Sequence, residues 1–270
     1  MPDSLGVSAA RRSAATLADF GLDLTGRVAI ITGASRGLGR AMALALAEAG
    51  ASVACVARSE EDLRETARLV EELGRQSMII GADITDIDDV AAIPEKVIDT
   101  FDKIDILVNN AGIIVGARFL DTSPKDWERV LNTNLIGAVN LTRVVGRILV
   151  EQGHGKVINI SSAWGTKPVP EHSAYCVTKA GLIQLTQVLA AEWARYNINV
   201  NCIAPGYFDT AIPAPAMAMP KLREVILKSI PLRRLGRPDE IGALAVYLAS
   251  EASQYMTGSV IAIDGGMLVR

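Results

Sequence analysis

Residues 27–39 read RVAIITGASRGLG, and this stretch decides the fold. It begins with a short apolar run that is typical of a buried strand, and the helical pattern that follows continues to Ala49. Glycine is needed between the two because a side chain would keep the backbone away from a pyrophosphate. The N-terminus of the helix offers free N–H groups and a partial positive charge. The spacing is G-x-x-x-G-x-G rather than the common G-x-G-x-x-G, but its position between a strand and a helix predicts a dinucleotide site.

The same alternation of short apolar runs and longer helical stretches continues almost to the C-terminus. We expect strands at 27–32, 52–57, 78–82, 104–108, 156–160, 198–203 and 260–263, and helices at 38–49, 60–73, 86–101, 124–150, 173–196 and 239–250. Such a pattern predicts a parallel sheet covered on both faces, and right-handed crossovers make it doubly wound. The expected fold class is α/β: a single doubly wound Rossmann-type domain over residues 26–270, with a seven-stranded parallel sheet flanked by helices. Residues 1–25 are expected to form a loosely ordered N-terminal tail.

The composition excludes several classes of function. The chain has 270 residues, half of them hydrophobic, and a net charge of −3 without clusters of Lys and Arg, which argues against a nucleic-acid partner. No apolar run approaches the ~20 residues of a membrane helix. Cys55, Cys176 and Cys202 stand too far apart for a metal-ligand pair, so no metal is expected, and their low, odd number suits a reducing compartment. The N-terminus lacks the apolar core of a secretory signal, and we predict a cytoplasmic protein.

The end of the second expected strand indicates which dinucleotide the chain prefers. NAD enzymes carry an acidic residue about 20 positions after the glycine loop to bind the ribose 2′-hydroxyl. This chain has Arg58 there, and Arg36 within the loop can reach the same group. Two guanidinium groups suit a 2′-phosphate, because their planar forks bind phosphate with paired hydrogen bonds. NADP(H) is therefore favoured. NAD(H) is the alternative, in which case both arginines are solvated surface residues.

A tyrosine and a lysine on one expected helix indicate the reacting centre. Tyr175 and Lys179 share a face of helix 173–196, so the lysine charge can lower the pKa of the phenol and help it exchange a proton near neutral pH. Ser162, which follows the fifth strand, can hydrogen-bond a substrate oxygen on which negative charge develops. These groups match the reduction of a carbonyl, whose oxygen needs a proton when its carbon accepts a hydride.

In this order and spacing the motifs resemble those of the short-chain dehydrogenase/reductase family over about residues 26–270. The motifs are Thr32–Gly39, Asn109-Asn110-Ala111-Gly112, Asn134, Ser162, Tyr175-x-x-x-Lys179 and Pro205-Gly206. The resemblance implies that Tyr175 is the acid/base and Ser162 the hydroxyl that polarises the substrate. It implies that Lys179 also binds the nicotinamide ribose and that Asn134 holds a water in the proton relay. Ser161 competes with Ser162, but Ser162 has the family's usual 13-residue separation from Tyr175.

The resemblance, together with the arginines discussed above and with the positions of Trp164 and His172 close to Ser162 and Tyr175 in sequence, gives the expected contacts to cofactor and substrate. The cofactor contacts are Gly33, Ser35, Arg36, Gly37, Leu38, Gly39, Arg58, Asp83, Ile84, Asn110, Gly112, Tyr175, Lys179, Pro205, Gly206, Phe208 and Thr210. Asp83 and Ile84 resemble the pair that contacts adenine, Asn110 and Gly112 the floor of the site, and residues 205–210 the loop that holds the nicotinamide amide. In that loop Phe208 stands where the family usually has Val or Ile. The expected substrate contacts are Ser162, Trp164, His172, Tyr175 and Tyr207, with residues 207–220 as a flap.

The substrate itself is what the sequence specifies least. The whole chain is most similar to 3-oxoacyl-[acyl-carrier-protein] reductases, through the run Pro231–Glu240 and through Asp264-Gly265-Gly266. Sugar and polyol dehydrogenases, gluconate dehydrogenases included, carry much the same elements. Carrier-protein reductases tend to present basic residues near the turn before the fifth strand, and residues 151–156 are only mildly basic here. This departure argues against an acyl-carrier protein as partner.

The expected function is therefore an NADP(H)-preferring oxidoreductase that interconverts a small-molecule carbonyl and a secondary alcohol. A 3-oxoacyl reductase is the main hypothesis, and a gluconate-type dehydrogenase or a general ketone reductase is the alternative. A non-enzyme alternative is an NADP-binding sensor or scaffold. An enoyl reductase is disfavoured, because that branch spaces its tyrosine and lysine more widely. The family usually forms tetramers through the helices that correspond to 124–150 and 173–196, so we expect a homotetramer.

Overall fold

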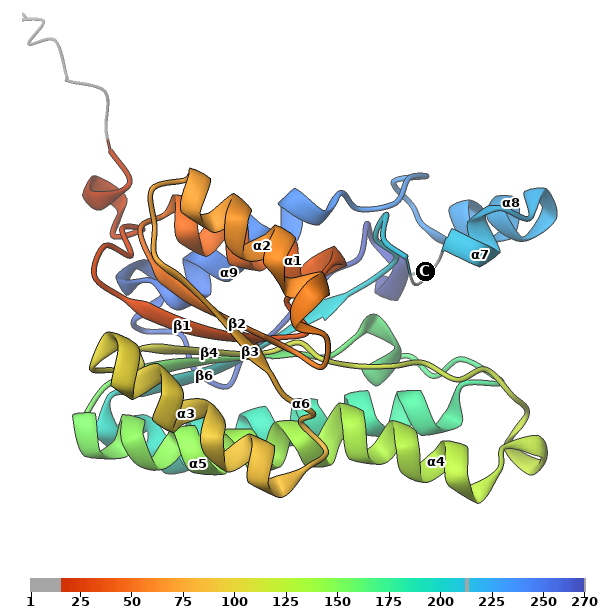
Figure 1. Cartoon of the computed structure of the whole chain (residues 1–270). Helices are drawn as coiled ribbons and strands as arrows, with labels where there is room; N and C mark the ends of the chain where they lie inside the picture. Colours follow the sequence, from red (N-terminus) through yellow and green to blue (C-terminus); the bar gives the residue numbers. More distant parts are fainter. Residues whose placement is uncertain (1–15, 212–213, 270) are drawn as a thin grey trace, which may run out of the picture.

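Parallel strands form the centre of the fold (Figure 1). The structure is a computed structural model and describes residues 16–211 and 214–269. The strands are β1 Val28–Thr32, β2 Ser52–Ala57, β3 Ser77–Gly81, β4 Ile106–Asn109, β5 Gly155–Ile160, β6 Ile198–Pro205 and β7 Val260–Ile263. In the described chain they form one seven-stranded sheet in the order β3-β2-β1-β4-β5-β6-β7, and each neighbouring pair is parallel. The expected doubly wound α/β fold is confirmed.

The winding of the chain reverses between β1 and β4, which are neighbours in the sheet although two strands separate them in sequence. Ile31 is paired with Val108 across this junction. Because all strands are parallel, their carboxyl ends meet at one edge of the sheet. In open α/β sheets, ligands bind at this edge, beside the point of reversal.

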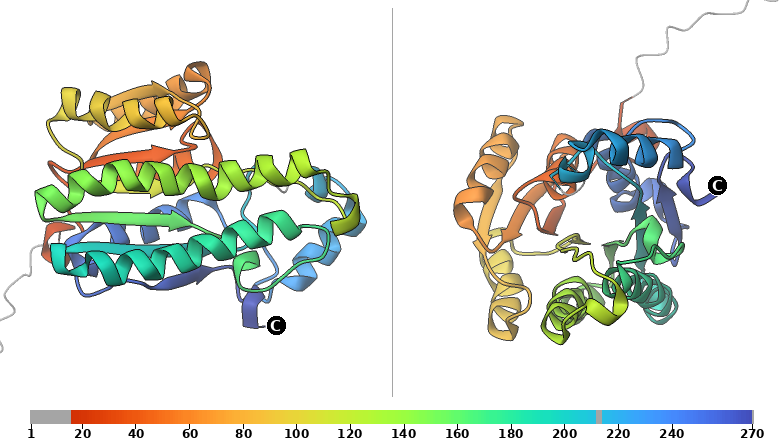
Figure 2. Two further views of the ribbon diagram at one scale, coloured as in Figure 1. Left: turned by 90° about the horizontal axis from the view of Figure 1, so that it is seen from below. Right: turned by 90° about the vertical axis from the view of Figure 1, so that its right-hand side faces the viewer.

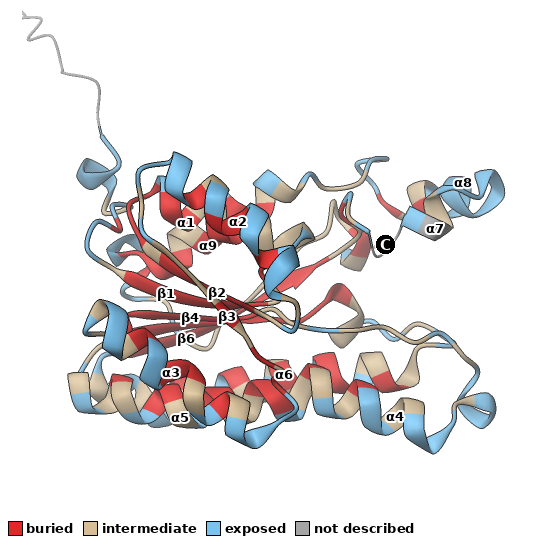
Figure 3. Ribbon diagram, viewed as in Figure 1, coloured by how far each residue is buried: buried red, intermediate tan, exposed pale blue. Residues whose placement is uncertain are grey.

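Helices cover both faces of the sheet (Figures 1 and 2). They are α1 Gly37–Glu48, α2 Glu60–Glu72, α3 Ile87–Phe101, α4 Pro124–Leu131, α5 Gly137–Gln152, α6 Ser173–Trp193, α7 Ala214–Met217, α8 Pro220–Ser229 and α9 Pro238–Ala249. One face carries α1, α2 and α9, whose buried side chains include Met42, Leu46 and Ile241. The other carries α3 to α6, with Val90 and Leu141 in a second core. The central strands and the sheet-facing sides of these helices are buried (Figure 3).

Side-chain caps explain where several helices begin. Ser59 precedes α2 and its hydroxyl accepts a hydrogen bond from the N–H of Asp62. Ser123 does the same for α4, and Asp86 caps α3 through two N–H groups of its first turn. Such caps satisfy N–H groups that have no partner within a helix. No helix among residues 16–211 and 214–269 is long and apolar enough to span a membrane.

The long helix expected at 124–150 differs from the structure. A π turn at Asn132–Ile136 separates α4 from α5, so the two helices are continuous but not one regular α-helix. The side chain of Asn134, in this turn, bonds the backbone of Ile113 in another segment. A contact of this kind depends on the tertiary structure, and the apolar pattern of the helix alone does not reveal it.

The segment before β1 is partly described. Residues 1–15 of the expected tail lie outside the described residues. Leu24 is 1% exposed and belongs to the core that faces α1 and α9. Its N–H donates to the carbonyl of Ala49 at 2.8 Å. Chain packed into the core thus begins before residue 26.

Candidate active site

Tyr175, Ser162 and Lys179 meet where β5 ends and α6 begins. Tyr175 lies in the first turn of α6, and Lys179 one turn later places its Nζ 5.6 Å from the centroid of the tyrosine ring. The Ser162 hydroxyl, just beyond β5, hydrogen-bonds the Tyr175 side chain. The same hydroxyl accepts the N–H of Trp164 at 3.1 Å, which fixes its orientation. The structure brings these three expected catalytic residues together.

Ser161, the competing serine, has a different role. It is buried, and its hydroxyl donates to the backbone carbonyl of Lys179 at 2.7 Å. This bond ties the end of β5 to α6. Ser161 therefore holds the helix in place, and Ser162 is the serine that bonds Tyr175.

Lys179 is held in an apolar environment. Its side chain is 4% exposed, and Nζ donates to the carbonyl oxygen of Ile160 at 2.7 Å. Burial lowers the pKa of Lys179 to about 8, because no carboxylate in the described chain pairs with it. Because the partner of the Lys179 ammonium is a neutral carbonyl, its positive charge is not cancelled and can interact with the side chain of Tyr175.

The tyrosine titrates differently from the expectation. Burial raises the pKa of Tyr175 above its usual value, and the hydrogen bond from Ser162 opposes this effect only in part. The expected lowering by Lys179 does not dominate in the chain alone, because removing the phenolate from water costs more. Tyr175 therefore carries its proton at neutral pH, as a proton donor must.

Asn134 is buried in the π turn and completes this group of polar side chains. Its Nδ2 donates to the Ile113 carbonyl, and its Oδ1 accepts the Ile113 N–H, both at 2.8 Å. A Cβ built on Gly112 would lie 3.3 Å from Asn134 Oδ1 and 3.5 Å from Lys179 Nζ. The two polar atoms thus face the same glycine, and Oδ1 keeps a second lone pair for a water.

The glycine loop leaves a cradle that side chains would fill. Gly33 and Gly37 have φ of +66° and +57°, a region that favours glycine. A Cβ on Gly33 would lie 2.9 Å from the Asn110 amide, and one on Gly39 would overlap the carbonyl oxygen of Gly33. α1 begins at Gly37 within this loop, and the free N–H groups at a helix N-terminus are able to stabilise a pyrophosphate. The residues present fit a dinucleotide.

Asn110 has a more structural position than expected. Its Nδ2 donates to the carbonyl oxygens of Thr32 at 2.9 Å and Gly33 at 3.2 Å. The Thr32 hydroxyl in turn accepts the N–H groups of Asn110 and Ala111, both at 3.0 Å. Asn110 therefore ties β4 to the loop after β1, and its amide nitrogen is used within the protein. This role was missed in the sequence, although an Asn that follows a buried strand is a signal for it.

Arg36 and Arg58 are both exposed near the carboxyl ends of β1 and β2. Neither has a hydrogen-bond or ion-pair partner within the part of the chain that the structure describes. By contrast Arg40, in the same helix turn, is tied to Thr66 and to the Ser35 carbonyl. The two free guanidinium groups are available for a ligand.

The expected adenine pair lies after β3. Asp83 accepts the N–H and the hydroxyl of Thr85, at 2.9 and 2.8 Å, which shapes the turn. Ile84 is 8% exposed and packs against Gly137 in α5. Their backbone is thus fixed beside the carboxyl end of β3.

The loop after β6 is attached to two other segments. Pro205 ends β6, and a Cβ on Gly206 would lie 2.7 Å from Asp264. Phe208, the residue that departs from the family pattern, is 4% exposed, and its ring occupies the space beside Gly236. Thr210 lies next to Gly37 of the glycine loop. The expected flap crosses residues 212 and 213, which lie outside the described residues.

Aromatic side chains form a wall beside Tyr175. Trp164 stands at its centre, with ring centroids 4.8 Å from His172, 5.9 Å from Tyr175 and 5.8 Å from Tyr207. His172 Nδ1 lies 3.0 Å from the Pro170 carbonyl, which can only accept, so Nδ1 carries the proton and Nε2 is free to accept. The expected substrate residues are therefore neighbours in space.

Some buried polar residues near the site were missed in the sequence. Asn109 Nδ2 donates to Thr142 and to Asn159, both at 2.8 Å, and Asn159 donates to Thr186. This series of hydrogen bonds links β4 and β5 to α5 and α6. Asn within strand-like apolar runs is the signal that could have revealed it. In the described ranges, no group of three His, Cys, Asp or Glu could hold a metal ion.

Comparison with known proteins places this geometry among oxidoreductases. Residues 33–268 match the family model described as Enoyl-(Acyl carrier protein) reductase. The chain is 42% identical over 249 residues to 2-dehydro-3-deoxy-D-gluconate 5-dehydrogenase of Dickeya dadantii, covering 92% of this chain and 98% of that protein. It is 39% identical over 246 residues to 3-oxoacyl-[acyl-carrier-protein] reductase FabG of Thermotoga maritima, covering 91% and 99%. A gluconate 5-dehydrogenase structure from Burkholderia cenocepacia, in complex with NADP and tartrate, aligns with a TM-score of 0.89 at 36% identity, covering 93% and 98%.

Proposed function

We propose a function from the premise that this chain belongs to the short-chain dehydrogenase/reductase family and is an NAD(P)-dependent oxidoreductase acting on CH–OH and C=O groups. Within that class we propose an NADP(H)-preferring enzyme with Tyr175 as acid/base and a polyhydroxy acid of the gluconate type as substrate. The observation that carries the chemistry is the Tyr175–Ser162–Lys179 group beside the glycine loop.

The proton chemistry follows from how these side chains are held. When bound, the nicotinamide supplies or takes the hydride. Tyr175, protonated at neutral pH, donates its proton to the carbonyl oxygen, and Ser162 hydrogen-bonds that oxygen as charge develops on it. Lys179 stabilises the phenolate that forms. A water bound between Asn134 Oδ1 and Lys179 Nζ would supply the proton that restores Tyr175 after the reaction.

The cofactor preference rests on Arg36 and Arg58. Both are exposed beside the strand ends where the adenosine ribose would lie, and both lack partners among the residues described. Charge-assisted, paired hydrogen bonds favour a 2′-phosphate at this position. The NADP bound to the Burkholderia cenocepacia relative supports the same preference.

The substrate class rests on the aromatic wall and on the relatives. Trp164 and Tyr207 offer ring faces for the C–H groups of a short carbon chain, and His172 Nε2 offers an acceptor for a hydroxyl. The gluconate-type relatives act on such molecules by their names, and this hypothesis is at least as well supported as the 3-oxoacyl one. The basic side chains within residues 151–156 are His154 and Lys156, and Lys156 lies in β5 and is buried. That position gives no basic surface for a carrier protein.

A 3-oxoacyl reductase is the second candidate, because FabG of Thermotoga maritima is almost as similar over the same length. A panel of carbonyl substrates with NADPH separates the two. We expect kcat/KM to be higher for keto acids of the deoxygluconate type than for 3-oxoacyl thioesters. A preference for the thioester would replace the first candidate with the second and leave the proton chemistry intact.

Tyr175→Phe tests the acid/base assignment. The variant keeps the ring but lacks the proton, so we expect kcat to fall by about 100-fold or more while NADPH binding, followed by fluorescence, stays near wild type. Tyr255→Phe is the matched control, because Tyr255 is fully exposed. Substantial activity in Tyr175→Phe would contradict the proposed role.

A further inference from the structure

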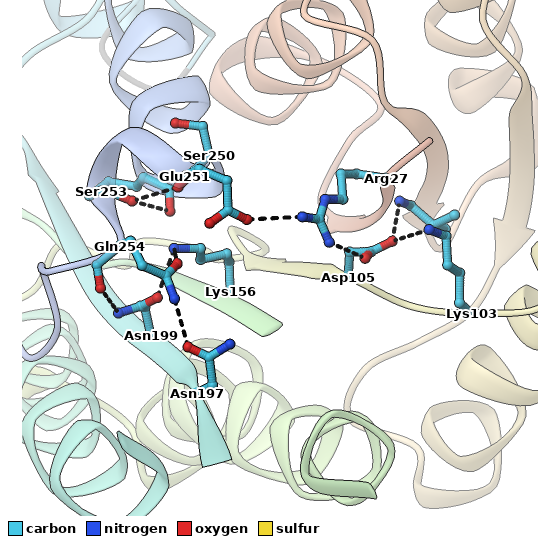
Figure 4. Close-up of polar contacts among 12 residues, drawn as sticks. Arg27, Lys103, Asp105, Lys156, Asn197, Asn199, Ser250, Glu251, Ser253 and Gln254 are labelled. Atoms are coloured by element: carbon cyan, nitrogen blue, oxygen red, sulfur yellow. Dashed lines mark hydrogen bonds and ion pairs between the residues drawn. The ribbon is translucent and has the colours of Figure 1, made fainter. Parts of the chain in front are cut away.

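A pocket lies at the amino ends of the strands, at the edge of the sheet opposite the candidate active site. Its volume is about 170 Å³. Its walls come from the starts of β4 and β5, the residue before β6 and the segment that follows α9. Figure 4 shows the polar side chains that meet there: Arg27 and Asp105 on one side, Lys156 and Gln254 on the other, and Glu251 between them.

Lys156 is the residue that makes this pocket chemically unusual. It is 7% exposed, and its Nζ donates to Asn199 Oδ1 at 2.7 Å and to Gln254 Oε1 at 3.1 Å. Both acceptors are neutral amides, and none of the described carboxylates forms an ion pair with Lys156. Burial lowers the pKa of Lys156 to about 8, and the nearby charge of Glu251 opposes this effect only in part. A buried cation without a directly paired counter-charge is energetically costly.

The amide groups of Asn199 and Gln254 are fixed in orientation, and neither carries a charge that could balance the ammonium of Lys156. Asn199 Nδ2 donates to the carbonyls of Gln254 and Met256, both at 3.1 Å. Gln254 Nε2 donates to Asn197 Oδ1 at 2.6 Å. Because both nitrogens are held elsewhere, both oxygens must face Lys156, and its third N–H remains for another acceptor in the pocket.

The carboxylates that line the pocket are already used. Asp105 pairs with Arg27 at 2.9 Å and with Lys103 at 3.4 Å, and it accepts the N–H of Val28. Glu251 pairs with the other terminal nitrogen of Arg27 at 2.9 Å. Arg27 and Lys103 thus balance Asp105 and Glu251, and the charge of Lys156 is in excess. His154, partly exposed on the same wall, has no acidic partner in the described chain and adds a further donor.

We propose that this pocket binds a small oxyanion, the carboxylate or phosphate group of a small ligand, which pairs with the ammonium of Lys156. The pocket has room for an ion of a few heavy atoms, and the third N–H of Lys156 and the His154 ring supply donors. This site is separate from the proposed cofactor and substrate sites, since it lies at the amino ends of the strands and shares no residue with them.

The first test is thermal unfolding with increasing inorganic phosphate, at constant ionic strength set with sodium chloride. Saturating NADPH is present throughout, so that the glycine loop is not the site measured. We expect a saturable rise in Tm of about 5 °C when phosphate reaches ~100 times its Kd. Lys156→Met should abolish the rise, and Lys103→Met, which touches the same Asp105 but does not line the pocket, should keep it. An equal rise in Lys156→Met, or no saturable rise in wild type, overturns the proposal.

A second measurement uses the wild-type chain alone and remains decisive if Lys156→Met does not fold. Calorimetry with acetate at pH 8, in buffers of different ionisation enthalpy, counts the protons taken up on binding. Acetate does not titrate at this pH, whereas an anion beside Lys156 raises the pKa of the ammonium, which is about half protonated at pH 8, so we expect an uptake of up to about half a proton. Binding of acetate without proton uptake at pH 8 would exclude Lys156 as the partner. Comparing the two ions shows whether the site prefers a carboxylate or a phosphate.

Discussion

The ammonium group of Lys179 is 4% exposed, donates to the carbonyl of Ile160 and lies beside the ring of Tyr175. Burial lowers its pKa from the usual 10.5 to about 8. Between these two values the unfolded chain holds a proton that the folded chain has lost. Stability from this group therefore rises as the pH increases from about 8 to about 10.5, and it is lowest where the folded lysine is charged. The positive charge of Lys179, which in the proposed mechanism stabilises the phenolate of Tyr175, therefore destabilises the fold at neutral pH.

Lys179→Met should remove this titration together with the activity. We expect the free energy of unfolding of the variant, relative to wild type, to be most favourable near pH 7. That advantage should shrink by about 3 kcal/mol between pH 8 and pH 10.5. Urea unfolding at several pH values measures the difference. Lys96→Met, at an exposed position of α3, is the control and should show no such trend. A constant difference for Lys179→Met would mean that the buried lysine keeps its usual pKa.

The proposed preference for NADP(H) depends on Arg58 binding the phosphate on the cofactor's ribose, and Arg58→Asp tests this directly. The change replaces a phosphate-binding fork with a carboxylate that repels phosphate and can accept a hydrogen bond from a 2′-hydroxyl. We expect the ratio of kcat/KM with NADPH to kcat/KM with NADH to fall by about 10- to 100-fold. Arg64→Asp, at an exposed arginine of α2 that pairs with Glu61, serves as control. An unchanged ratio in Arg58→Asp would refute the phosphate role.

At the scale of elements, the junction of β1 and α1 depends on how closely two backbone segments approach. A Cβ on Gly39 would overlap the carbonyl oxygen of Gly33 and come within 2.6 Å of the Asn110 amide. Neither neighbour can move freely, because Asn110 also ties this loop to β4. Gly39→Ala should therefore lower the free energy of unfolding by about 2 kcal/mol and weaken NADPH binding at least tenfold.

The control for this prediction is Gly74→Ala at the end of α2. Gly74 has a φ of +73°, and an added Cβ would meet no atom within 4 Å. Its cost is that of a left-handed conformation alone, about 1 kcal/mol, with NADPH binding unchanged. Chemical denaturation and a fluorescence titration follow both quantities. Equal NADPH affinity in both variants would show that the approach of Gly39 to Gly33 does not shape the cofactor cradle.

The elements differ in how well the sequence predicts them. β2 and β7 have the bounds expected from their apolar runs, since strands buried in a parallel sheet carry their signal locally. The π turn and the position of Asn110 could not be predicted in this way, because both depend on bonds to distant segments. The same holds for Lys156, whose place at the start of β5 gave no sign of the amides around it. Family motifs identified the residues near Tyr175, but only the structure shows that Trp164 joins three of them.

For the whole molecule, the two edges of the sheet have separate tasks. The carboxyl edge carries Tyr175 and the glycine loop, and the amino edge carries the ion pair of Arg27 with Asp105, which is 3% exposed. Asp105→Asn should leave Arg27 and Lys103 without their shared partner and lower the free energy of unfolding by about 2–4 kcal/mol. We expect kcat to stay near wild type at temperatures where the variant is folded. Asp126→Asn, in an exposed pair on α4, should cost well under 1 kcal/mol. A large loss of kcat in folded Asp105→Asn would show that the edges are coupled.

The π turn at Asn132–Ile136 also changes the phase of the helix that contains it. One extra residue in a turn rotates everything beyond it by about 100° around the helix axis, since an α-helix has 3.6 residues per turn. The residues on either side of the turn can therefore present their apolar faces in different directions: α4 packs against α6, and α5 against α3. The continuous helical segment of α4 and α5 thus packs against two different helices. Deleting one residue from the π turn would rotate α5 back into register with α4. Either α3 or α6 would then face the polar side of this segment.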